Sequence, residues 1–183
     1  MGKNNFYIIN GGPGVGKTTL INEFSKNGFL TQEEEARKII RKQLAKNGDG
    51  VPWLNKTLYA QLMLNASIRT YDKMKRDKPS DIVFFDRGVL DTVCYMNMER
   101  IPVPDKMCAA IHTCVYNKKI FILPPWKEIY HTDKERRQSW REAIRTFEIM
   151  KETYLDNGYE VIEIPKLPTL ERLHFILEIV APF

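Results

Sequence analysis

The stretch that decides the fold runs from Asn10 to Thr19 and reads Asn-Gly-Gly-Pro-Gly-Val-Gly-Lys-Thr-Thr, directly after the apolar run Phe6–Ile9. Gly11, four further residues and then Gly16-Lys17-Thr18 match the phosphate-loop pattern G-x-x-x-x-G-K-[ST] in its required context, after a strand and before a helix. Glycines let backbone N–H groups turn inward around an anion, and the following helix directs its positive end at the same point. The pattern predicts a triphosphate-binding loop, and the alternative is a chance glycine-rich turn.

Each part of this loop has an expected task in nucleotide binding. We expect Lys17 to reach the β- and γ-phosphates and the hydroxyl of Thr18 to be a ligand of Mg²⁺. ATP and Mg²⁺ are the expected cofactors. The expected nucleotide-binding residues are Gly11, Gly12, Pro13, Gly14, Val15, Gly16, Lys17, Thr18 and Thr19.

Length and composition are those of an ordinary globular protein. The chain has 183 residues, of which 43% are hydrophobic and 28% charged, with a net charge of +5. We expect one domain over residues 1–183 that needs no disulfide framework, since its three cysteines show no paired spacing. The charge is too diffuse to argue for nucleic acid, and no apolar segment suggests a signal or a membrane span. We expect a cytoplasmic protein without a membrane partner, of open oligomeric state.

Strand and helix patterns alternate along the whole chain. We expect strands at 6–9, 29–31, 82–85, 119–123 and 159–164, and helices at 17–26, 33–47, 52–77, 90–100, 105–113, 132–156 and 169–180. Pro52 is expected to begin the third helix, because proline is accommodated in a first turn, and Thr132 to begin the sixth through a capping box with Glu135. The alternation predicts an α/β fold, a parallel sheet with helices on both faces.

Asp86 and Arg87 end the apolar run Ile82–Phe85, which is typical of a strand buried on both faces. The carboxyl end of such a strand faces the ligand crevice of an open α/β sheet. Asp86 is therefore the candidate metal-side carboxylate, and Arg87 a candidate for holding the acceptor or the moving phosphoryl group. Asp91 is a weaker candidate for orienting Arg87 or contacting the acceptor. The alternative is a surface ion pair.

Glu34 follows the second expected strand, at the same edge of the sheet as the phosphate loop, and is the candidate general base. Glu33 or Glu35 could take its place. Arg37 is close enough along the chain to pair with one of the three and keep it ionised. The alternative is that these acids only favour the start of a helix.

Arginines crowd the segment after Pro124-Pro125-Trp126, and we expect a lid at about 124–145 that delivers Arg136 and Arg137 to the transition state. Arg137, Arg141 and Arg145 share one helical stripe, for which a solvated face is the alternative. Trp126 is the best candidate for stacking on a ring. Packing in the core is nevertheless the preferred reading of Trp53, Trp126 and Trp140.

Four stretches carry a family resemblance: Gly11–Thr19, Glu34–Arg37, Phe84–Thr92 and Pro124–Arg137. With them, nearly the whole chain resembles small bacterial AAA-type P-loop ATPase or kinase-like domains, and more distantly nucleoside and nucleotide kinases, nicotinamide riboside kinases included. The resemblance implies a three-layer P-loop NTPase sandwich with strand order 2-3-1-4-5. It also implies an acid at Glu34, an Asp-Arg pair at Asp86-Arg87 and lid arginines at Arg136 and Arg137.

The chain departs from two related groups. It lacks the helical second domain and sensor residues of AAA+ motors, and Asn117-Lys118 continues without the guanine-binding motif of GTPases. The leading hypothesis is an ATP-dependent kinase acting on a small metabolite, with nucleosides and nucleotides as candidate acceptors. The alternative is an ATP-binding and hydrolysing regulatory module that acts on a protein partner. Nucleic-acid binding ranks third.

Overall fold

The computed structural model describes residues 5–78, 80–130 and 139–180. Its centre is a five-stranded parallel sheet in the order β2-β3-β1-β4-β5, which confirms the expected topology. The strands are β1 (Phe6–Gly11), β2 (Leu30–Gln32), β3 (Val83–Asp86), β4 (Lys119–Leu123) and β5 (Glu160–Glu163). The helices are α1 (Lys17–Lys26), α2 (Glu35–Ala45), α3 (Lys56–Asp77), α4 (Leu90–Met98), α5 (Asp105–Thr113), α6 (Trp140–Asp156) and α7 (Thr169–Val180), with a 3₁₀ turn, η1 (Lys127–Ile129).

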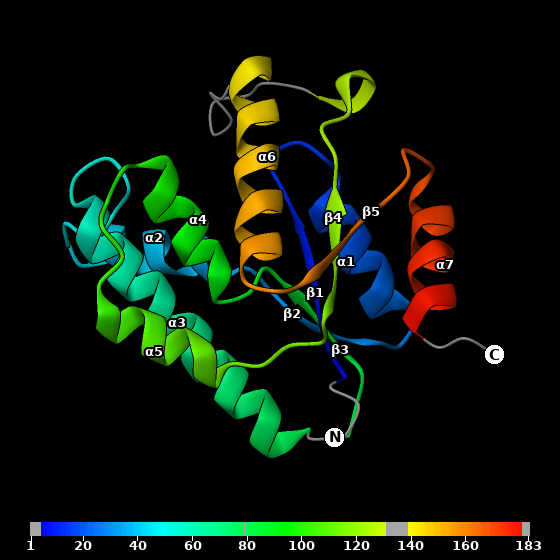
Figure 1. Cartoon of the computed structure of the whole chain (residues 1–183), viewed down its shortest axis with the longest axis horizontal. Coiled ribbons are helices and arrows are strands. Elements are labelled where there is room, and N and C mark those ends of the chain that lie inside the picture. The colour runs from blue at the N-terminus through cyan, green and yellow to red at the C-terminus, as the bar shows by residue number, and fades with distance from the viewer. Residues whose placement is uncertain (1–4, 79, 131–138, 181–183) are drawn as a thin grey trace.

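Helices cover both faces of the sheet, because successive residues of the central strands point to opposite sides. Phe6 and Ile8 of β1 belong to the core beneath α3, α4, α5 and α6, and Tyr7 and Ile9 to the core beneath α1 and α7. Figure 1 shows these two helical layers on either side of the strands. The three-layer α/β sandwich is therefore as expected.

Strand register brings the predicted site residues to one edge of the sheet. Ile9 of β1 lies beside Asp86 of β3, and Gly11 beside Leu123 of β4. Gln32, two residues before Glu34, lies beside Phe85. The carboxyl ends of β1, β2 and β3 therefore bring the phosphate loop, Glu34 and Asp86 together, toward the top of the sheet in Figure 1.

One expected helix start is wrong, and one expected helix is interrupted. α3 begins at Lys56, not at Pro52, because the side chain of Asn55 accepts a hydrogen bond from the backbone N–H of Leu58 and caps the helix there. α6 begins at Trp140 behind a capping box of Ser139 and Glu142, and Ser139 itself is extended, so no helix runs through it. The start expected at Thr132 lies outside the described residues.

The expectation that Trp53 packs in the core is also wrong, since 60% of its surface is exposed. It lies between α2 and α3 beside exposed Leu54, and Leu44 of α2 is exposed as well.

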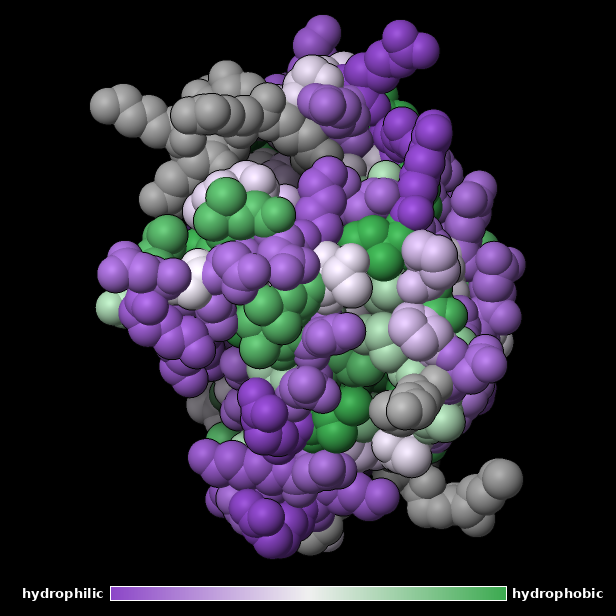
Figure 2. Space-filling model, turned by 90° about the vertical axis from the view of Figure 1, so that its left-hand side faces the viewer, coloured by the Kyte–Doolittle hydropathy of each residue, from purple (hydrophilic) through white to green (hydrophobic). Residues whose placement is uncertain are grey.

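Figure 2 views the molecule from the side of α2 to α5 and shows hydrophobic patches among hydrophilic side chains. Within the described ranges, no helix has the length and apolar character needed to cross a bilayer.

Candidate functional site

The phosphate loop connects β1 to α1 through two glycines in the left-handed region. Gly14 has φ 79° and Gly16, the residue before α1, has φ 84°, conformations that other residues adopt at a cost. A Cβ atom on Gly14 would lie 3.0 Å from the ring of Tyr130, which packs over the loop. The backbone shape that the phosphate-loop pattern requires is therefore present, and the segment after β4 lies against it.

Lys17 and Asp86 form a buried ion pair in which Nζ of Lys17 donates to Oδ1 of Asp86. Burial has the largest effect on both: it lowers the pKa of Lys17 and raises the pKa of Asp86, against their mutual attraction. The pair is therefore costly to keep out of water.

Arg87 is the centre of the polar network beside this pair. Its Nε donates to Oε1 of Glu34 at 2.8 Å, Nη1 to Oδ1 of Asp91 at 3.2 Å, and Nη2 to the backbone carbonyl of Gly11 at 3.2 Å. Burial would lower the pKa of Arg87, but Glu34, Asp91 and Asp86 together raise it above its ordinary value. The guanidinium thus ties β1, β3 and the start of α2 together.

The backbone of Arg87 is itself unusual, with φ 75°. A side chain in the left-handed region costs about 1–2 kcal/mol, and such strain concentrates at functional sites. Gly88 follows under tight packing, since an added Cβ would lie 2.5 Å from Cδ1 of Ile8. Side-chain bonds and close packing hold this turn in place.

Glu34 lies directly before α2, and 17% of its side chain is exposed. Burial alone would raise the pKa of Glu34, but Arg87, Lys17 and Arg37 together hold it below its ordinary value. Nε of Arg37 lies 3.6 Å from Oε2 of Glu34. Of the three acids with which Arg37 was expected to pair, it therefore pairs with Glu34. Glu34 is accordingly ionised at neutral pH.

The other two acids lie farther from the network. Glu33 is 79% exposed and lies 3.7 Å from Nζ of Lys38. Glu35 accepts a hydrogen bond from the hydroxyl of Thr70 at 3.0 Å. Of the three candidates, the structure therefore brings Glu34 to Arg87, Lys17 and Asp86.

Asp91 supports the turn after β3 from the first turn of α4. Its Oδ2 accepts from the backbone N–H of Gly88 at 2.8 Å and from the hydroxyl of Tyr154 at 2.7 Å, while Oδ1 faces Arg87. Of the two tasks expected for Asp91, orienting Arg87 and contacting the acceptor, these contacts fit the first. Tyr154 on α6 is a contributor that the sequence did not single out, because a buried tyrosine at helical spacing is indistinguishable from core.

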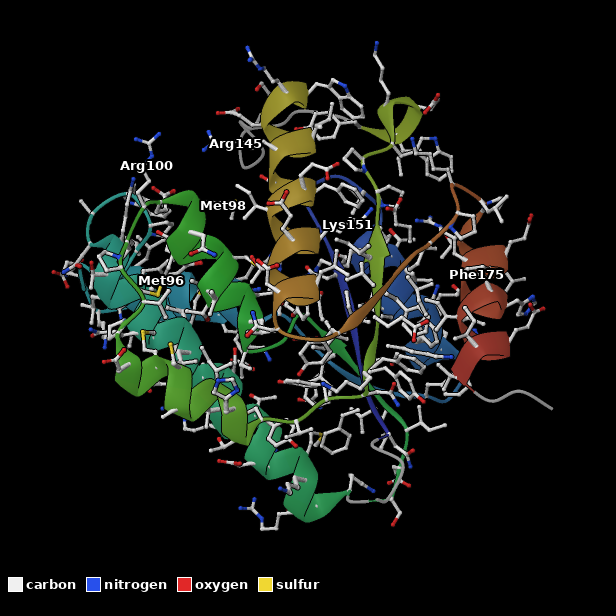
Figure 3. The ribbon with its side chains drawn as sticks, in the orientation of Figure 1. Met96, Met98, Arg100, Arg145, Lys151 and Phe175 are labelled. Atoms are coloured by element: carbon white, nitrogen blue, oxygen red, sulfur yellow. The ribbon has the colours of Figure 1, made fainter. Side chains whose placement is uncertain are left out.

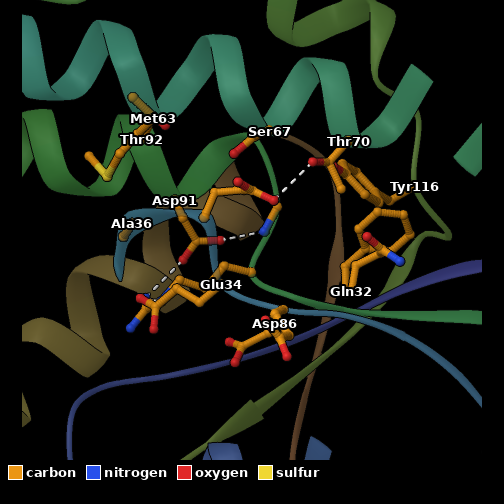
Figure 4. Close-up of a pocket in the computed structure, with 15 residues that line it drawn as sticks. Gln32, Glu34, Ala36, Met63, Ser67, Thr70, Asp86, Asp91, Thr92 and Tyr116 are labelled. Carbon is orange, nitrogen blue, oxygen red and sulfur yellow. Dashed lines mark hydrogen bonds and ion pairs between the residues drawn. The ribbon is translucent and has the colours of Figure 1, made fainter. Parts of the chain in front are cut away.

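A pocket opens beside this network, between the carboxyl ends of β2 and β3 and the side of α3 (Figure 4). Glu34, Asp86, Arg87 and Asp91 contribute to its wall. The remaining lining residues are Gln32, Glu33, Glu35, Ala36, Met63, Ser67, Thr70, Phe85, Gly88, Thr92 and Tyr116. The wall thus combines carboxylates, hydroxyl groups and apolar side chains.

Tyr59 on α3 is a second residue that sequence reasoning left in the core. Burial, and the negative charge of Glu34, raise the pKa of Tyr59 to about 12. Its ring packs edge-on against Tyr95. Tyr59 is therefore a neutral phenol within the electrostatic reach of the site.

The predicted lid is described only in part. Arg136 and Arg137 lie outside the described residues, so their contribution stays a prediction. Arg141 and Arg145 are exposed on α6, and Figure 3 shows Arg145 extending on the side of α4. Trp126 lies with its ring centroid 5.5 Å from the guanidinium of Arg172, a residue of α7 that the sequence did not mark.

The residues expected to hold Mg²⁺ have suitable chemistry. Thr18 is exposed at the start of α1, and Asp86 has a second carboxylate oxygen besides the one that Lys17 contacts. Hydroxyl and carboxylate oxygens, completed by phosphate and water, are what Mg²⁺ prefers. Among the described residues, no group of three or more His, Cys, Asp or Glu forms a metal cage. Thr18 and Asp86 therefore fit an ion that is held mainly by a nucleotide.

Solved structures resemble this chain over nearly its full length. Two structures of NadR protein, one in complex with NR and one with NAD and AMP-PNP, superpose with TM-scores of 0.69 and 0.66 at 20% and 22% identity. They cover 99% of this chain, which spans about half of NadR (51% and 49%). Thymidylate kinase from Ehrlichia chaffeensis matches with a TM-score of 0.64 at 15% identity, covering 96% of this chain and 97% of its own.

Shikimate kinase from Aquifex aeolicus is a more distant neighbour, with a TM-score of 0.54 at 14% identity, covering 94% of each chain. A search of curated protein sequences found no match. The sequence model of a family described as an AAA domain matches residues 6–172. The chain therefore belongs to this AAA domain family, and its fold is that of a P-loop kinase-like domain.

Proposed function

We propose that the protein is an ATP-dependent kinase that transfers the γ-phosphoryl group of ATP to a hydroxyl group of a small metabolite. The observation that carries the proposal is the meeting of Lys17, Asp86, Arg87 and Glu34 at one edge of the sheet, beside a pocket. Phosphoryl transfer depends mainly on positioning and charge neutralisation, and these residues supply both.

The donor half consists of the phosphate loop, residues 11–19, and the first turn of α1. Lys17, which contacts Asp86 in the structure, contacts phosphate oxygens when ATP is bound. Asp86 and Thr18 would hold Mg²⁺, which would neutralise charge on the phosphates. NadR, about half of which this chain resembles, has a structure in complex with NAD and AMP-PNP, and this supports ATP as the expected ligand.

The acceptor half is the pocket next to Glu34. Ionised Glu34 accepts the hydrogen bond of the attacking hydroxyl group and takes its proton as the new bond to the γ-phosphorus forms. The bond between the γ-phosphorus and the bridging oxygen breaks at the same time, and ADP leaves. Arg87 fixes the position of Glu34 through their 2.8 Å bond. Arg136 and Arg137 remain candidates for neutralising charge on the transferred group, as a lid would.

The charge of the pocket favours an acceptor that does not already carry a phosphate. Among the described lining residues there are five carboxylates, and Arg87 is the one cation. Its Nε, Nη1 and Nη2 atoms already donate to Glu34, Asp91 and the backbone carbonyl of Gly11. The five carboxylates are already paired with cations, namely Arg87 and, outside the lining, Lys17, Arg37 and Lys38. Because a phosphate would find no unpaired cation among the described lining residues, a neutral or cationic hydroxyl compound such as a nucleoside fits better than a nucleotide.

A screen of acceptors tests this function. ADP formation from ATP and Mg²⁺ is followed with nucleosides, their monophosphates and other hydroxyl metabolites, and ATP binding is measured in parallel. We expect acceptor-dependent ADP formation that prefers nucleosides to their monophosphates and disappears in Lys17→Ala. Intact ATP binding without any acceptor-dependent ADP formation contradicts the proposal.

The second candidate is an ATP-hydrolysing module that acts on a protein partner. It is favoured by the exposed apolar side chains Leu44, Trp53 and Leu54, with 55%, 60% and 67% of their surfaces exposed. In that case Glu34→Gln leaves the function largely intact, whereas Lys17→Ala abolishes ligand binding. A kinase loses activity with either change.

A further inference from the structure

Arg172 is a buried arginine that contacts the phosphate loop from the far end of the chain. It comes from the first turn of α7 and is 5% exposed. Its Nη1 donates to the backbone carbonyl of Val15 at 3.3 Å, and Nη2 to the hydroxyl of Thr169 at 3.4 Å. A Cβ atom on Gly16 would lie 3.1 Å from Nη1. The guanidinium therefore packs directly on the loop backbone.

The charge of Arg172 is not balanced by a carboxylate in the described part of the chain. One face of the guanidinium lies over Trp126, and Nε is buried with no hydrogen-bond partner among those residues. Burial lowers the pKa of Arg172. An unpaired buried charge is expensive, and an apolar side chain would fill the same space at lower cost. Filling the core does not account for an arginine at this position.

The contact with Val15 determines where the next N–H group points. The carbonyl of Val15 and the N–H of Gly16 belong to one planar peptide unit and point in opposite directions. Because Arg172 holds the carbonyl on the α7 side, the N–H of Gly16 faces the other side of the loop, where the phosphate-loop pattern places the anion.

We propose that Arg172 is a positioning residue for triphosphate binding: its guanidinium fork joins the carbonyl of Val15 to Thr169 and so pre-orients the N–H of Gly16 toward the phosphates. The proposal rests on the proposed binding of ATP by the loop. The fork also adds positive charge beside the start of α1, which strengthens the attraction for an anion. Trp126 holds the guanidinium plane in this orientation.

Binding measurements on the full chain test the proposal. Isothermal titration with Mg²⁺·ATP and with inorganic tripolyphosphate is performed on the wild type, Arg172→Met, Arg172→Lys and the exposed-arginine control Arg69→Gln, and thermal unfolding is recorded for each. Arg172→Met is expected to weaken the binding of both ligands about tenfold, because the variant loses the hydrogen bond that the charged group donates to Val15. Arg172→Lys keeps the charge but not the fork, and is expected to lose about threefold, an intermediate effect.

The outcomes separate this proposal from its alternatives. If Arg172→Met has a lower melting temperature but unchanged affinity for both ligands, Arg172 has a purely structural role and the proposal is overturned. If Arg172→Met does not fold, unchanged affinity in Arg172→Lys overturns the proposal instead. If Arg172→Met binds ATP more weakly but binds tripolyphosphate as the wild type does, Arg172 contacts the adenosine part of ATP and not the phosphates. That result also overturns the proposal. If the wild type binds neither ligand and Lys17→Ala changes nothing, the proposed function itself has failed.

Discussion

Replacing Glu34 with Gln changes the site in two measurable ways. The substitution keeps the shape of the side chain but removes the charge that Arg87 contacts at 2.8 Å and Arg37 at 3.6 Å. Removing one partner of a buried pair costs about 3–5 kcal/mol when the other charge is left alone. Arg87 keeps Asp91, and a glutamine can still accept its hydrogen bond, so we expect a loss of about 1–3 kcal/mol in unfolding free energy.

The same substitution removes the proposed general base. Loss of a general base lowers turnover by about 10²- to 10⁴-fold. We therefore expect kcat to fall by that factor with an identified acceptor, while the affinity for Mg²⁺·ATP changes little. Glu33→Gln is the matched control, because Glu33 is exposed and has no contact with Arg87. Equal turnover in the two variants would refute the assignment of Glu34.

The pH dependence of stability gives an independent readout of Glu34. The pKa of Glu34 in the folded protein lies below its ordinary value of 4.5, so its stabilising contribution is present above that value and is lost as the pH falls through the folded-state pKa. The unfolding free energies of the wild type and of Glu34→Gln are measured by urea titration between pH 7 and 3. The difference between them is expected to shrink toward low pH. A difference that does not change with pH contradicts the depressed pKa.

Four further substitutions test other parts of the site. Lys17→Ala is expected to weaken Mg²⁺·ATP binding by about 10- to 100-fold, measured by titration calorimetry, since charge-assisted hydrogen bonds contribute about 1.5–3 kcal/mol; unchanged affinity would place the nucleotide elsewhere. Gly14→Ala adds a Cβ at φ 79° and 3.0 Å from Tyr130, and is expected to destabilise the fold by about 1–2 kcal/mol in thermal unfolding. Asp91→Ala and Tyr154→Phe each remove the 2.7 Å hydrogen bond from the Tyr154 hydroxyl to Asp91, so a double-mutant cycle is expected to show coupling of about 0.5–3 kcal/mol, and strict additivity would argue against it.

Local patterns predicted the parts of the fold that depend on short stretches of chain. The phosphate loop, α1 and the buried strand β3 follow from glycine spacing and unbroken apolar runs, and the sheet order followed from the family resemblance. Helix starts were less predictable where two capping signals compete. Pro52 is an acceptable first-turn signal, but Asn55 caps α3. Within the described residues Ser139 caps α6, and the start expected at Thr132 stays a prediction.

Contacts across the sheet could not be inferred from sequence patterns. The pairing of Glu34 with Arg87 joins residues 53 positions apart, and the contact of Arg172 with Val15 spans 157 positions. In the sequence Arg172 looks like an ordinary helix residue, because nothing local shows that the last helix packs beside the phosphate loop. The electrostatic influence of Glu34 on Tyr59 was not predicted either, because a tyrosine at helical spacing usually serves only the core.

The most direct test of the central claim follows the γ-phosphoryl group itself. ATP labelled on its γ-phosphate is incubated with the protein, Mg²⁺ and nucleosides or other hydroxyl compounds, and the products are separated. A kinase built as described transfers the label to an organic acceptor and leaves little as inorganic phosphate, and Lys17→Ala and Glu34→Gln transfer none or almost none. Label that appears only as inorganic phosphate, at the same rate with every acceptor and in Glu34→Gln, would contradict the account.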